Sequence, residues 1–156
     1  MRNLIKNIKK ALPNWQKDEL NPFAPKVKTK YVTLDEVLII HDDMIARYGG
    51  SFGIRDMGLI ESALARPKAS FSGVDLYPGI TDKAAALFHS LIFNHAFTDG
   101  NKRTTLTVTA RFLSINGYEL KATQEEIVEF PLWVDNTHPK IEEIAKWLEE
   151  HTEKRE

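Results

Sequence analysis

Residues 84–115 read AAALFHSLIFNHAFTDGNKRTTLTVTARFLSI, two apolar segments joined by a short polar loop. Apolar side chains recur at helical spacing in segments 84–93 and 106–115. Several threonines favour strand in the second segment, but Leu106, Ala110 and Leu113 keep the helical period. We therefore predict that both segments are helices and that they form the centre of the fold.

The flanking sequence predicts further helices and few strands. Two capping boxes mark helix starts, Thr33 with Glu36 and Thr123 with Glu126. Other helix starts are expected at Asp56, Thr81 and Pro139, and helix stops at Gly49, Pro67, Gly117 and Pro131. The prediction is an all-α bundle of about six helices. It allows for a short flap hairpin in residues 71–80, before the central helices.

Charge is unevenly distributed along the chain. Residues 1–30 hold eight Lys or Arg and two acidic residues, a balance of +6, which leaves −7 for the remainder. Three prolines punctuate this segment, so we place residues 1–30 in a basic N-terminal extension and residues 31–150 in the folded domain. A basic extension is compatible with contact to nucleic acid, lipid headgroups or the acidic body, and equally with a solvated tail.

Composition excludes several classes of protein. An apolar content of 42% fits a normal core and excludes wholesale disorder. The chain has no cysteine, which excludes a disulfide framework and a thiol nucleophile. No apolar run is long enough to span a membrane, and lysines interrupt the apolar residues near the N-terminus, so a cytoplasmic location is expected. The histidines at 41, 89, 138 and 151 lack ligands at metal spacing, so they are predicted to be structural or solvated, without zinc.

The loop at residues 95–103 combines residue types that suit phosphate chemistry. Lys102 and Arg103 stand where a helix begins, and the positive end of the helix dipole disfavours cations unless an anion lies nearby. A nucleotide phosphate, bound by backbone N–H groups and by both side chains, would be such an anion. Gly100 lets the backbone approach an anion closely.

Two further residues of the loop suit catalysis and metal binding. The imidazole of His95 is able to take a proton from an attacking hydroxyl, although a histidine also suits the C-terminus of a helix. Asp99 is able to hold Mg²⁺ beside phosphates bound by Asn101 and the cations, although Asp-Gly is also a common turn. The adjacency of these residues favours the functional interpretation.

The loop resembles the central motif of the Fic/Doc family. The motif His-x-Phe-x-Asp/Glu-Gly-Asn-x-Arg is matched at His95, Phe97, Asp99, Gly100, Asn101 and Arg103. Upstream, residues 41–50 and 55–61 are similar to the Doc branch, the death-on-curing toxins. The likeness covers about residues 31–150 and implies an all-α fold that transfers a phosphate-containing group from a nucleotide to a protein hydroxyl.

The resemblance also implies a role for each matched residue. His95 would be the general base, Asp99 the Mg²⁺ ligand and Arg103 a phosphate-binding residue. Gly100 and Asn101 would form the anion hole.

Two positions depart from the relatives that transfer AMP. Those relatives carry glycine where this chain has Lys102, and usually a second arginine where it has Leu106. In the Doc branch the lysine accompanies a reversed ATP, of which only the γ-phosphoryl group moves. The ammonium of Lys102 would bind phosphate and act in catalysis by neutralising the transferring group.

The resulting prediction is a Doc-like toxin of a type II toxin–antitoxin system. It would be a kinase that uses ATP and Mg²⁺ to modify a hydroxyl of a protein, with translation elongation factor Tu as the suspected target. A Fic-type protein adenylyltransferase (AMPylation) is the alternative. A non-catalytic module that binds nucleic acid or membrane through the basic extension is the remaining hypothesis; the kinase itself would require no nucleic acid.

The resemblance carries expectations about partners as well. No glutamate is followed by Gly or Asn, so the self-inhibitory helix of some Fic proteins is absent. Inhibition in trans by a separate antitoxin is therefore expected. Residues 71–80 occupy the place of the flap that aligns the target polypeptide in Fic relatives, and a plain connecting loop is the alternative.

Overall fold

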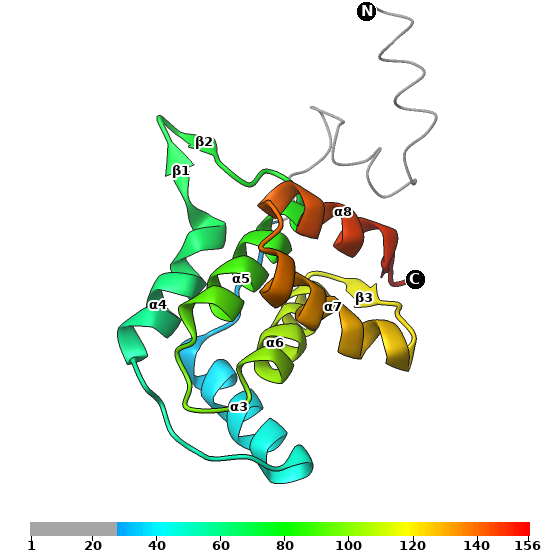
Figure 1. Ribbon diagram of the computed structural model, residues 1–156. Coiled ribbons are helices and arrows are strands. Elements are labelled where there is room, and N and C mark those ends of the chain that lie inside the picture. The colour runs from blue at the N-terminus through cyan, green and yellow to red at the C-terminus, as the bar shows by residue number, and fades with distance from the viewer. Residues whose placement is uncertain (1–27) are drawn as a thin grey trace, which may run out of the picture.

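The computed structural model describes residues 28–156, so the expected basic extension lies almost wholly outside the described residues. Within this range the chain forms six helices, α3 (Leu34–Tyr48), α4 (Met57–Ala65), α5 (Ile80–Asn94), α6 (Asn101–Ile115), α7 (Gln124–Thr137) and α8 (Ile141–Glu150). Figure 1 shows α5 in the middle of the bundle, where it packs against α4, α6 and α8. The predicted helical bundle is confirmed. None of the helices in the described part of the chain has the length and apolar character needed to cross a membrane.

Reciprocal hydrogen bonds set the starts of several helices. The Thr33 hydroxyl accepts the N–H of Glu36 at 3.3 Å, and the Glu36 carboxylate accepts the N–H of Thr33 at 2.9 Å. The box at residues 123–126 forms in the same way, so both predicted capping boxes are confirmed. The first central helix begins one residue earlier than predicted, because the Asp82 carboxylate accepts the N–H of Gly79 at 3.0 Å.

Helix α6 forms although its first half is rich in threonine. The hydroxyls of Thr105, Thr107 and Thr109 donate to the carbonyl oxygens four residues earlier, at 2.7, 2.9 and 2.8 Å. These three hydroxyls are therefore satisfied inside their own helix. The local preference of threonine for strands is overridden because the same helix buries Val108 and Phe112 completely.

Helix α7 contradicts one prediction, because it continues through Pro131 to Thr137 instead of ending at Phe130. Proline has no N–H, so the carbonyl four residues earlier loses its helical donor. Phe130 and Val134 flank the proline and are 3% and 0% exposed. Burial of this face offsets the missing hydrogen bond, and the longer helix carries Asp135 to the loop at residues 95–103.

Two short antiparallel strand pairs accompany the helices in residues 28–156. β1 (Ser70–Phe71) pairs with β2 (Val74–Asp75), after a 3-10 turn at Arg66–Lys68. This hairpin projects from the bundle in Figure 1, so the flap hairpin for which the prediction allowed is present. β3 (Tyr118–Leu120) pairs with β4 (Thr152–Lys154), a pair that the sequence did not predict.

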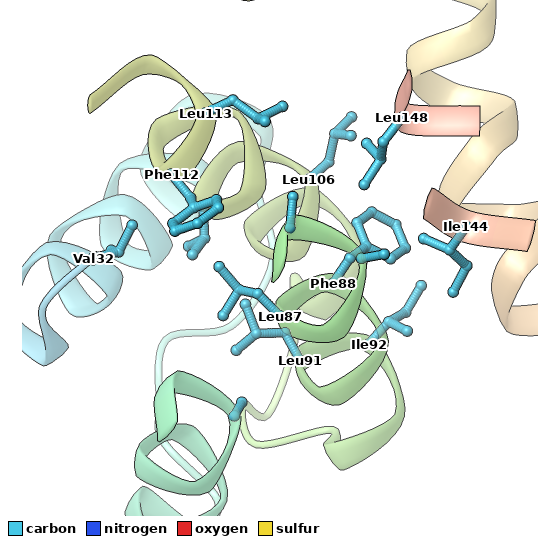
Figure 2. Packing of buried hydrophobic residues seen from close by; sticks show 14 of the residues in the cluster. Val32, Leu87, Phe88, Leu91, Ile92, Leu106, Phe112, Leu113, Ile144 and Leu148 are labelled. Atoms are coloured by element: carbon cyan, nitrogen blue, oxygen red, sulfur yellow. The ribbon is translucent and has the colours of Figure 1, made fainter. Parts of the chain in front are cut away.

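The core lies where α5 and α6 meet α8. Figure 2 shows the side chains of Phe88, Ile92 and Leu113 converging there with those of Ile144 and Leu148. All five are fully buried. Full burial of one such side chain is worth roughly 1.5–3 kcal/mol. This packing fixes the end of α5 and the body of α6, and with them the loop between the two helices.

Candidate active site

The loop between α5 and α6 turns through two left-handed residues. His95 follows the last residue of α5 with φ 45° and ψ 50°, and Gly100 precedes α6 with φ 75°. A non-glycine residue in this conformation costs about 1–2 kcal/mol. The surrounding contacts therefore hold His95 against a local preference.

Backbone pairing attaches this loop to the segment that joins α3 and α4. The N–H of Arg55 donates to the carbonyl of Ala96 at 2.7 Å, and the N–H of Thr98 donates to the carbonyl of Gly53 at 3.1 Å. Ile54 and Phe97 form an isolated antiparallel bridge between these bonds. Residues 53–55 thus form one wall of the loop, and Arg55 is the first residue of the second stretch that resembles the Doc branch.

The side chain of Asn101 closes the loop on itself. Its amide nitrogen donates to the carbonyl of Phe97 at 2.9 Å, and its amide oxygen accepts the N–H of Phe97 at 3.1 Å. This side chain is therefore engaged in shaping the loop. The backbone N–H groups at the start of α6 have no partner within their helix, which leaves them to an anion.

His41 supports the loop from below and is 1% exposed. Its Nε2 lies 2.8 Å from the carbonyl oxygen of Asp99, to which it donates. Its ring stacks on Phe97 with 3.9 Å between the ring centroids. Of the two roles left open for His41, structural or solvated, these contacts show the structural one, and no pattern in the sequence indicated which residues it would hold.

Asp99 presents its carboxylate at the surface with one backbone donor on each oxygen. Oδ2 accepts the N–H of Ser51 at 3.1 Å, and Oδ1 accepts the N–H of Gly100 at 2.7 Å. These two bonds, that of Ser51 first, lower the pKa of the Asp99 carboxyl from its ordinary value of 3.8. Gly50 permits the approach, because a Cβ there would lie 2.5 Å from Oδ2. The carboxylate is thus held in its charged form.

Lys102 and His95 share a carboxylate on α7. The Nζ of Lys102 lies 3.1 Å from Oδ2 of Asp135, and the Nε2 of His95 lies 3.8 Å from Oδ1 of the same residue. Sequence reasoning did not find Asp135, because it stands outside the motif and on the part of α7 that was expected to lie beyond a helix end.

Arg103 bridges the start of α6 and the end of α3. Its Nη2 donates to the carbonyl of Gly49 at 2.9 Å, and its Nη1 donates to the carbonyl of Met44 at 3.4 Å. Its guanidinium also lies 5.9 Å from the centre of the Tyr48 ring. Protein groups therefore compensate part of the positive charge of Lys102 and Arg103, so a phosphate is not the only explanation for these two cations.

A cavity of about 630 Å³ opens over the start of α6. All six candidate residues of the sequence analysis line it, namely His95, Asp99, Gly100, Asn101, Lys102 and Arg103. Leu106 and apolar residues of α7 form another part of its wall. Ligand sites of 300–1,000 Å³ with apolar walls and a few convergent polar groups are typical of small-molecule binding. The cavity therefore has the size and the polarity for a nucleotide.

The donor set of the cavity fits Mg²⁺ held together with phosphate. Each oxygen of Asp99 accepts one backbone N–H and retains further acceptor capacity toward the open side. Mg²⁺ is commonly bound by one or two carboxylates and by the phosphates of a substrate. Among residues 28–156, no group of three or more His, Asp or Glu side chains is arranged to hold a metal ion by itself.

Comparison with known proteins identifies the family. The Fic/DOC family matches residues 31–113, which include the whole loop. The Toxin Doc of Mycolicibacterium smegmatis is 47% identical over 94 residues, which cover 60% of this chain and 70% of the relative. The Protein kinase doc of Escherichia phage P1 is 33% identical over 94 residues, which cover 58% and 71% of the two chains. On these matches and on the geometry of the loop, the chain belongs to the Fic/Doc family.

Proposed function

We propose that this protein is a Doc-like toxin and a protein kinase, which transfers the γ-phosphoryl group of ATP to a hydroxyl of another protein. The position of Lys102 carries the proposal. Its ammonium and the imidazole of His95 lie on two sides of one carboxylate, that of Asp135, at 3.1 and 3.8 Å. This proximity of an ammonium and an imidazole supports a site at which a phosphoryl group and its acceptor hydroxyl would meet.

The chain's own residues would divide the reaction among them. The Nε2 of His95 takes the proton of the acceptor hydroxyl as its oxygen bonds to the γ-phosphorus, and the bond from that phosphorus to the β-phosphate oxygen breaks to leave ADP. Lys102, Arg103 and the backbone N–H groups after Gly100 hold the phosphate oxygens. Mg²⁺ held by Asp99 would neutralise charge on the phosphates.

Leu106 favours phosphoryl transfer over AMP transfer. It lines the cavity and is 7% exposed, and a leucine side chain cannot bind a phosphate. Lys102 fills space and adds charge at the position where the relatives that transfer AMP have glycine. Both features oppose the nucleotide orientation that AMP transfer uses.

The substrate and the regulator are further parts of the proposal. A relative that is 47% identical bears the name Toxin Doc, and this supports a toxic action of the chain. We propose that its target is a translation component, with elongation factor Tu as the suspected protein. Restraint by a separate antitoxin fits a chain in which no glutamate is followed by Gly or Asn. A purified antitoxin that abolishes labelling of the target would support this part.

Labelled nucleotides test the reaction type. The purified chain is incubated with Mg²⁺, a cell lysate and ATP labelled at either the γ- or the α-phosphate. We expect γ-label on a lysate protein, its loss in His95→Ala and Asp99→Ala, and its retention in His151→Ala. Label from α-labelled ATP alone would establish AMP transfer instead. Absence of both labels, with salt-sensitive binding to nucleic acid, would favour a non-catalytic module.

A further inference from the structure

Asp135 is the carboxylate that faces both reactive side chains of the proposed site. Its side chain is 22% exposed, and its two oxygens point to different partners, Oδ2 to Lys102 and Oδ1 to His95. Those partners are 39% and 43% exposed, so the carboxylate is the most enclosed of the three groups.

The continuation of α7 past Pro131 places this residue. Val134, the neighbour of Asp135, is fully buried and fixes the orientation of the last turns of the helix. Pro131 and Leu132 line the cavity one turn before Asp135. The carboxylate is therefore held by a packed helix, whereas His95 and Lys102 belong to the loop and to the first turn of α6.

We propose that Asp135 is a positioning residue for the phosphoryl transfer proposed above, on which this inference rests. Its Oδ2 keeps the ammonium of Lys102 beside the base. Its Oδ1 compensates the positive charge that appears on His95 when the imidazole takes the proton of the acceptor hydroxyl. At 3.8 Å in a partly enclosed site, such opposite charges attract strongly enough to matter for the barrier.

The charge of Asp135 gives the proposal a distinctive signature. A carboxylate next to Lys102 competes with phosphate oxygens for the same ammonium, so it cannot strengthen the binding of ATP. Its loss is therefore expected to lower kcat while the affinity for ATP with Mg²⁺ stays equal or rises. A residue that merely supported the shape of the cavity would lower both together.

Three variants separate these possibilities. Asp135→Asn keeps the shape and removes the charge, Asp135→Glu keeps the charge, and Glu129→Gln removes an exposed charge elsewhere on α7. We expect Asp135→Asn to lower kcat about ten- to a hundredfold, Asp135→Glu to restore part of it, and Glu129→Gln to change nothing. Circular dichroism melts establish that each variant is folded.

A double-mutant cycle tests whether Asp135 acts through Lys102. Combination of Asp135→Asn with Lys102→Met should lower kcat by much less than the product of the two single effects, because the pair works as one unit. Factors that multiply, a kcat of Asp135→Asn equal to that of the wild type, or a parallel loss of ATP affinity would each overturn the proposal.

Calorimetric titration with ATP and Mg²⁺ keeps this test separate from the proposed function. If the wild type binds ATP but transfers no γ-label, the proposed function fails. The role of Asp135 is then judged only from the ATP affinities of Asp135→Asn and the wild type. Equal or tighter binding of ATP by Asp135→Asn would then support a location of the carboxylate beside Lys102, where it competes with the phosphates. Weaker binding of ATP would refute that location. A wild type that binds no ATP would refute both.

Discussion

His41 Nε2 lies 2.8 Å from the carbonyl oxygen of Asp99, although the two residues are 58 positions apart in the chain. This bond joins the middle of α3 to the proposed Mg²⁺ ligand from the buried side. The opposite face of Asp99 is open to the cavity. The loop is therefore positioned by a residue that never meets solvent or ligand.

Substitution of His41 by Ala should destabilise the protein by about 3 kcal/mol, because it removes a buried ring and leaves a carbonyl oxygen without its donor. Transfer activity should fall as well, since Asp99 loses its support. His41→Gln retains a hydrogen-bond donor without the ring. Its free energy of unfolding in urea should lie between those of the wild type and His41→Ala. Wild-type stability of His41→Ala would contradict this account.

Glu36 should make stability depend on pH at the acidic end. The N–H of Thr33 first, and Arg111 of α6 through its hydrogen bonds, lower the pKa of the Glu36 carboxyl from 4.5. The contribution of Glu36 to the free energy of unfolding is therefore complete above about pH 4.5. It is lost as the pH falls through the lowered pKa of the folded state.

Urea unfolding of the wild type and Glu36→Gln from pH 7 to pH 2 provides the measurement. The difference in unfolding free energy should be constant at neutral pH and should vanish at the acidic end. In an Arg111→Met background the difference should shrink but persist, because Thr33 is the larger cause. A difference in unfolding free energy between the wild type and Glu36→Gln that stays the same at all pH values would exclude this explanation.

Gly50 should not tolerate a side chain. Its φ is 116°, and a Cβ would lie 2.5 Å from Oδ2 of Asp99. Gly50→Ala should therefore cost about 2 kcal/mol and displace the carboxylate, with a loss of transfer activity of about a hundredfold. Gly117→Ala is the matched control, because its φ is 85° with open space around the added Cβ. It should lose stability but keep activity, and equal activity in both variants would contradict the prediction.

Lys83 should anchor the flap hairpin. It is 3% exposed, and its ammonium bonds to Asp75 at 3.1 Å and to the carbonyl of Tyr77. Lys83→Met should accelerate cleavage by chymotrypsin after the exposed Phe71, because the hairpin loses its attachment to α5.

ATP affinity provides the control for this variant. The hairpin does not line the cavity, so Lys83→Met should bind ATP with Mg²⁺ as the wild type does. Lys146→Met, which removes an exposed lysine of α8, should leave both cleavage and affinity unchanged. Slower cleavage of Lys83→Met than of the wild type would show that other contacts hold the hairpin.

The central helices and the residues of the loop were predictable because their signals are local. Apolar spacing identifies α5 and α6, and the nine positions of 95–103 hold the candidate site residues and the family motif together. The capping box of Thr33 with Glu36 is also a local signal, because its two hydrogen bonds join residues within one helical turn.

Features that depend on distant contacts were not predictable in this way. The rule that proline ends a helix failed at Pro131, because burial of Phe130 and Val134 outweighs one lost hydrogen bond. For the same reason Asp135 was not predicted, because it lies on the part of α7 after Pro131. The pair of β3 and β4 joins residues more than thirty positions apart, and short strands of this kind have no pattern of their own.

Arg103 ties the filling of the cavity to the end of α3. Its guanidinium is the donor to the carbonyls of Met44 and Gly49, and the same guanidinium lines the cavity. A phosphate that drew this side chain inward would remove its hydrogen bonds to these two carbonyls, while the N–H of Gly49 would still donate to the carbonyl of Ile45. On the proposed function, binding of a nucleotide would therefore take one side-chain contact away from the Gly49-Gly50 corner.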